Sequence, residues 1–132
     1  MSCKSALYAA NLNNQTLSSG DTISFGSIVR RFGCNTNLYG GNVVVNGTGY
    51  YDIDTNFDFA PTAAGTVTIE LYKNGTKIPG AEATWSVAAD VNYHISIPAI
   101  IREACCCESV ITAIITGADS VVTNAAITVK KI

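Results

Sequence analysis

The sequence predicts an all-β fold, an antiparallel sandwich or jelly roll of about eight to ten strands. In residues 50–59, polar Asp52, Asp54, Asn56 and Asp58 alternate with mostly apolar neighbours, as in a strand with one buried face. The same alternation returns in residues 66–73, and Asn74-Gly75 then supplies the two positive-φ residues of a type I′ hairpin turn. Turn signals also recur about every ten residues along the chain, a spacing typical of sandwiches.

Taken in order, the elements between these turns are short strands. We expect them at residues 6–10, 22–25, 28–32, 42–45, 50–59, 66–73, 83–87, 93–98, 110–116 and 125–129. A single open sheet of that size would leave a bare face and two bare edges, so two packed layers are favoured. Helical turns are expected only in residues 100–107, one or two at most, next to the loop that Pro98 marks.

Length and composition predict one domain, residues 1–132, in which residues 1–12 serve as an N-terminal docking or edge segment. Hydrophobic residues make up 48% of the chain and charged residues 14%, well below the roughly 25% typical of soluble domains. No apolar run reaches the ~20 residues of a membrane span, and the first residues lack the apolar core of a signal peptide, so no membrane partner is expected. The surplus apolar surface is therefore expected in subunit contacts.

The charge distribution argues against nucleic acid as a partner. The formal net charge is −2, and the eight Lys and Arg residues are scattered singly or in pairs. Proteins that bind nucleic acid need clustered positive charge to neutralise phosphates.

Several segments resemble one jelly-roll superfamily. They are Gly49-Tyr50-Tyr51-Asp52-Ile53 and the strand end Leu71-Tyr72-Lys73-Asn74-Gly75. These resemble the trimeric jelly roll shared by tumour necrosis factor and the complement globular heads. The opening SCKSALYAAN, RRFGC at residues 30–34 and REACCC at residues 102–107 are most similar to standalone bacterial and bacteriophage versions, which are related to the C-terminal heads of collagen-like spore-surface proteins.

The resemblance implies a homotrimer without enzymatic activity that docks onto other structural proteins. No Gly-x-y collagen stalk is present, so we expect a bacteriophage virion structural protein, either a capsid decoration or a head-fibre component, assembled in the bacterial cytoplasm. The alternatives are a surface adhesin or carbohydrate-binding head with a glycan partner, and a structural protein of the bacterial cell or spore surface. One fold hosts many functions, so these alternatives stay open.

Five cysteines form the one unusual site signal in the chain. Cys105 and Cys107 point the same way in an extended segment and Cys106 points oppositely, so neighbours do not pair easily. Cys3, Cys34, Cys105 and Cys107 are candidates for a four-thiolate zinc site. A disulfide or reduced packing thiols are the alternatives, because the usual spacing of zinc-binding cysteine pairs is missing.

No other cofactor is expected, and no catalytic residue. The Asp52-x-Asp54-x-Asn56-x-Asp58 row lacks the glycine and glutamate of a calcium loop, so it is expected to be a solvated strand face. His94 is the only histidine and is expected to point outward from a strand, while Trp85 is expected in the core.

The late strands are almost free of charge, and they are expected to provide apolar area near a threefold axis. Ile114 and Ile127 are the candidate trimer-interface residues in these strands. A charge at either position should dissociate or unfold the protein, depending on the face that each occupies.

Overall fold

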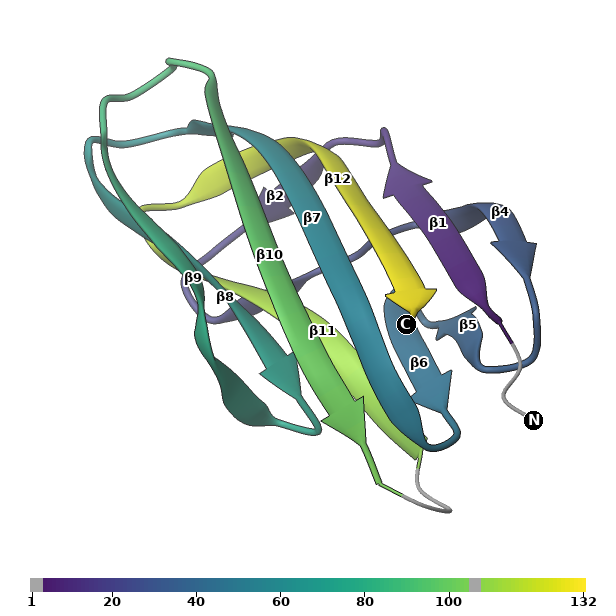
Figure 1. Cartoon of the computed structure of the whole chain (residues 1–132). Helices are drawn as coiled ribbons and strands as arrows, with labels where there is room; N and C mark the ends of the chain where they lie inside the picture. Colours follow the sequence, from purple (N-terminus) through teal and green to yellow (C-terminus); the bar gives the residue numbers. More distant parts are fainter. Residues whose placement is uncertain (1–3, 105–107) are drawn as a thin grey trace.

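The computed structural model describes residues 4–104 and 108–132 and consists of two packed antiparallel sheets (Figure 1). The strands are β1 (Ala6–Asn11), β2 (Gln15–Leu17), β3 (Asp21–Ile23), β4 (Ser27–Phe32), β5 (Thr36–Tyr39), β6 (Asn42–Asn46), β7 (Gly49–Pro61), β8 (Gly65–Lys73), β9 (Thr76–Val87), β10 (Tyr93–Glu103), β11 (Glu108–Gly117) and β12 (Ser120–Lys131). The predicted all-β jelly roll is confirmed.

Each sheet has six strands. Sheet A has the order β10-β7-β12-β1-β4, with β2 pairing with β12, and sheet B has the order β5-β6-β11-β8-β9, with β3 pairing with β11. Strands β10 and β4 are thus the two opposite edges of sheet A, and Figure 1 shows them at opposite sides of the molecule. The edge strands β9 and β10 of the two sheets lie along the same flank of the sandwich.

The core fills the space between the sheets, as the alternating pattern of β7 predicts. Tyr51, Ile53 and Phe57 are fully buried, and the ring of Phe57 lies 5.8 Å from that of Phe25 between their centroids. The hairpin between β8 and β9 is also as predicted. Asn74 and Gly75 both have positive φ, 51° and 79°, and Lys73 pairs with Thr76.

The expected helical turns at residues 100–107 are wrong for residues 100–103, which continue β10. Ile101 pairs with Tyr51 and Glu103 with Gly49, so the long β7 holds this segment extended beyond Pro98. Residues 105–107 lie outside the described part of the chain.

The sequence also missed two short strands, β2 and β5, which carry no long alternating run. Within the predicted N-terminal docking or edge segment, residues 6–11 form β1. This strand lies between β12 and β4, so it is an inner strand of sheet A and not an edge.

Candidate functional site

The outer face of sheet A is polar and acidic in the half formed by β7 and β10. Asp52, Asp54, Asn56 and Asp58 of β7 lie on this face, while the odd-numbered residues between them point into the core. Asp52 pairs with Ile100 and Asp54 with Pro98 across the β7–β10 ladder. The predicted solvated face is therefore present, and it forms one half of a larger exposed surface.

A chain of side-chain contacts crosses this half of the face. His94 Nδ1 lies 2.6 Å from Asp58 Oδ1, and His94 Nε2 lies 3.1 Å from Ser96 Oγ. Ser96 Oγ donates to Asn56 Oδ1 at 2.7 Å, and Asn124 Nδ2 of β12 donates to Asp58 Oδ2 at 3.3 Å. These contacts hold β10, β7 and β12 together through their outward side chains.

Asp58, His94 and Ser96 lie in the order of a hydrolase triad, yet the serine is not activated. The hydroxyl hydrogen of Ser96 points to Asn56, so His94 does not receive it. His94 and Asp58 are also about half exposed, so water competes for both groups. Sequence reasoning missed this network because Asp58 meets His94 only through strand register. The available signal was the His-x-Ser spacing in a strand beside an acidic strand.

The other half of the face, formed by β1 and β4, is apolar and basic. Every residue of β4 is exposed, including Arg30 and Phe32, and the Phe32 side chain is 61% exposed. Tyr8 of β1 is exposed beside them and pairs with Arg30. Arg31 differs, because its Nε donates to the Thr36 carbonyl of sheet B.

The two candidate interface residues occupy different surroundings. Ile127 is 1% exposed and belongs to the core between the sheets, so within one chain it offers no surface to a neighbour. Ile114 is half-buried on the outer face of sheet B, paired with Thr22 and Glu70. The interface role of these residues stays a prediction.

One end of the sandwich gathers Tyr51, Glu103 and the Cys34 loop. The Tyr51 hydroxyl lies 3.0 Å from the Asn46 carbonyl and 2.8 Å from the Gly47 carbonyl. Burial raises the pKa of Tyr51 above its ordinary value, and the nearby charges of Glu103 and Cys34 raise it further. Glu103 is buried, and within the described part of the chain its Oε2 accepts no hydrogen bond.

Of the four cysteines of the predicted zinc site, the structure describes only Cys34. Cys34 is exposed, and its Sγ lies 3.8 Å from Asn35 Oδ1. Cys3, Cys105 and Cys107 lie outside the described residues. Across residues 4–104 and 108–132, no group of three or more His, Cys, Asp or Glu residues is placed to hold a metal ion. The zinc site stays a prediction.

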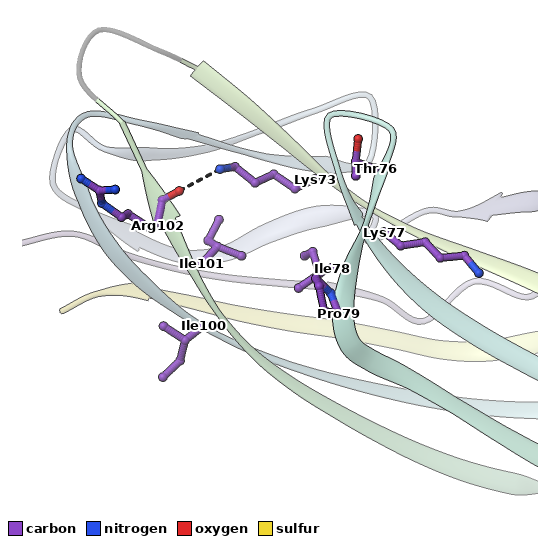
Figure 2. Close-up of a pocket in the computed structure, with 8 residues that line it drawn as sticks. All are labelled: Lys73, Thr76, Lys77, Ile78, Pro79, Ile100, Ile101 and Arg102. Carbon is purple, nitrogen blue, oxygen red and sulfur yellow. Dashed lines mark hydrogen bonds between the residues drawn. The ribbon is translucent and has the colours of Figure 1, made fainter.

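A small hollow of about 260 Å³ opens on the flank between β9 and β10 (Figure 2). Ile78 and Pro79 of β9 face Ile101 of β10 across it. Lys73, at the end of β8, reaches across the hollow and donates to the Arg102 carbonyl at 2.7 Å. The hollow therefore has apolar walls and a lysine at one end.

Trp85 of β9 lies on the same flank, beside aromatic rings of β10 and β7. It is 45% exposed and does not belong to the core, so the expected core position is wrong. Its ring lies 6.4 Å from that of Tyr93, which in turn stacks on buried Phe59 at 5.8 Å.

Comparisons with known proteins identify the fold. Solved structures with similar folds include murine APRIL at pH 8.5 (TM-score 0.77, 16% identity, 98% of this chain and 99% of that one) and the Eiger TNF of S. frugiperda (0.72, 13%, 97% and 91%). The globular domain of zebrafish complement 1qA is also similar (0.68, 9%, 95% and 94%). The chain therefore has the jelly-roll fold of tumour necrosis factor and complement heads.

The sequence comparisons add no family to this result. No family model matches the chain, and no curated protein matches it. Among the residues that the structure describes, no helix is long and apolar enough to cross a membrane.

Proposed function

We propose that the protein is a non-enzymatic structural head that assembles as a homotrimer and serves in a bacteriophage virion, as a capsid decoration or head-fibre component. The observation that carries self-association is the division of the sheet A outer face into two unlike halves. One half carries the acidic row of β7 next to the β10 edge, and the other carries basic and apolar residues and ends at the β4 edge. The similarity to tumour necrosis factor and complement heads supports this form of assembly.

Strand register places matching residues in the same row of sheet A at its two edges. Ile100 pairs with Asp52, Asp52 with Lys130, Lys130 with Ala6, and Ala6 with Phe32. Exposed Ile100 and exposed Phe32 thus lie in one row of sheet A, at opposite edges.

The neighbouring row matches by charge. From the β10 edge inward, Pro98 pairs with Asp54, Asp54 with Thr128, Thr128 with Tyr8, and Tyr8 with Arg30 at the β4 edge. Asp54 therefore lies one strand in from the β10 edge, and Arg30 has to reach past Pro98 to meet it. A rotation about an axis parallel to the strands keeps each row at its height. In such an assembly Phe32 of one copy meets Ile100 of the next, and Arg30 meets Asp54.

The contact joins two different patches, so it is head-to-tail. Such contacts close into rings when the rotation permits, and three copies form the ring known for this fold. The apolar pair would be buried at the centre of each contact, with the charged pair beside it. Triad activation is missing at Ser96, which supports a structural rather than enzymatic role.

Exchanging the charged pair tests this arrangement. We expect Arg30→Asp to raise the dissociated fraction, since it turns an attraction worth about 0.2–1 kcal/mol at each contact into a repulsion. The combined variant Arg30→Asp with Asp54→Arg should restore the assembly. Both side chains are exposed, so neither change should unfold the chain. A combined variant that dissociates more than the single one would contradict the register match.

The virion role is tested separately by cosedimentation of the purified protein with particles that lack it. Saturable binding at a fixed number of copies per particle supports a decoration protein. An absence of binding to capsids and fibres alike would contradict the virion role and leave the trimer proposal intact.

A carbohydrate-binding head is the second candidate function. It is favoured by exposed Trp85, whose ring lies tilted beside that of Tyr93, and by the hollow of about 470 Å³ that Asp58, Asn92 and His94 line together with Tyr93. Aromatic faces and fixed polar groups are the features that bind sugar rings. A glycan array probed with the protein and with Trp85→Ala separates the two functions. A saturable glycan signal that is lost in the variant would favour this candidate.

A further inference from the structure

The hollow between β9 and β10 combines an aliphatic wall with a lysine that is only partly used. Its wall consists of Ile78, Pro79 and Ile101, of which Pro79 is exposed and Ile78 partly exposed. Exposed aliphatic surface of this kind is costly in water and favours an apolar occupant. The volume of about 260 Å³ lies just below the roughly 300–1,000 Å³ of drug-sized pockets, so the occupant is small.

The charges at the hollow are all positive. Lys73, Lys77 and Arg102 line it, and none of the described lining residues is acidic. They are not equivalent. Lys77 Nζ lies 2.7 Å from Glu70 Oε2, outside the hollow, and this hydrogen bond raises the pKa of Lys77. Figure 2 shows the Lys77 and Arg102 side chains running to opposite sides, away from the aliphatic wall.

Lys73 is the cation that turns inward. One of its three N–H groups donates to the Arg102 carbonyl at 2.7 Å, which fixes the ammonium across the end of the hollow. Two N–H groups remain to donate to an anion. A carboxylate fits this position, because its oxygens accept from an ammonium while an attached aliphatic chain lies along Ile78 and Ile101.

We infer that this hollow is a binding site for short aliphatic monocarboxylates. The carboxylate binds Lys73 at the end where β8 and β10 meet, and the chain packs on the aliphatic wall. The lining residues all belong to a single chain. Ile100 at the rim is also the residue that the proposed trimer places against Phe32 of the next copy, so the inference uses only the wall formed by Ile78, Pro79 and Ile101. Thr76 also lines the hollow.

The test is a titration of the intact ¹⁵N-labelled protein with octanoate, followed by NMR. We expect saturable shifts centred on residues 73–79 and 100–102. Octanol, which has the same chain and no charge, should bind more weakly by about threefold to tenfold, the value of one partly exposed charged contact.

Two lysine variants make the test specific to the inward cation. Lys73→Met should weaken octanoate by the same factor and leave octanol unchanged. Lys77→Met is the matched control, since it removes a lysine of the same hollow that faces Glu70, and it should leave octanoate affinity within about twofold. Equal binding of octanol and octanoate, equal effects of the two variants, or no saturable shifts at millimolar octanoate would each overturn the inference. The spectrum of each variant shows directly whether it is folded.

Discussion

The buried Tyr51 predicts how the stability of the protein falls at alkaline pH. Its hydroxyl is buried against the Asn46 and Gly47 carbonyls, and its pKa in the folded state is raised by burial first, then by Glu103 and Cys34. The neutral phenol is thus the form that the folded state holds. The stabilisation is complete below the unfolded pKa of about 10, and it is lost as the pH rises through the folded pKa.

The size of the loss follows from proton linkage. Between the unfolded and folded pKa values, this one group lowers the free energy of unfolding by about 1.4 kcal/mol per pH unit. Tyr51→Phe removes the titration and therefore flattens the slope by that amount. At neutral pH the same variant costs about 1–2 kcal/mol, because it removes the donor that the two carbonyls share.

The assay is urea unfolding at a series of pH values from 8 to 11. Tyr50→Phe is the matched control, since Tyr50 is the neighbouring tyrosine and is exposed. We expect the control to keep the wild-type slope and Tyr51→Phe to lose part of it. Equal slopes above pH 10 for wild type and Tyr51→Phe would refute the assignment of alkaline sensitivity to this buried phenol.

Three further predictions concern the sites that the sequence indicated. Ile127→Asp should unfold the chain, since it buries an unpaired charge in a domain stabilised by about 5–15 kcal/mol. Ile114→Asp should remain folded by circular dichroism, with a thermal midpoint close to wild type. A folded Ile127→Asp would contradict the core placement. Elemental analysis of protein purified without chelator decides between the alternatives for the cysteines. If Cys3, Cys34, Cys105 and Cys107 hold zinc, about one zinc per chain is found and Cys34→Ser lowers it, whereas less than a few tenths of a zinc removes the site and leaves a disulfide or reduced thiols. A fluorophosphonate reagent should leave Ser96 unlabelled by mass spectrometry, because its hydroxyl hydrogen points to Asn56, and stoichiometric labelling would contradict a structural role for the Asp58 network.

The strands with strict alternation could be predicted from the sequence. In β7 the even positions face solvent and the odd positions fill the core, so the sequence of this strand alone shows which of its faces is buried. Asn74-Gly75 likewise fixes its hairpin locally. The extension of β10 past Pro98 could not be predicted, because residues 100–103 are held extended by pairing with β7, a contact between segments about 50 residues apart.

Which residues of the two late strands point into the core could not be predicted from the sequence, for a different reason. Residues 110–116 and 125–129 are nearly uncharged on both sides, so composition does not distinguish an inward isoleucine from an outward one. The pairing of Ile127 with Ala9 and Thr55 places it in the core, and that pairing is tertiary. The Asp58, His94 and Ser96 network and the matching rows of Phe32 and Ile100 also depend on register across sheet A, which a single sequence does not specify.

The measurement that tests self-association most directly is the absolute mass by light scattering during gel filtration, at micromolar concentration, with and without reductant and chelator. The account predicts three times 13.8 kDa, or about 41 kDa, for the wild type. It further predicts a shift toward 13.8 kDa for Arg30→Asp and a return in the combined variant with Asp54→Arg. A wild-type mass of one chain under every condition would contradict the proposed assembly.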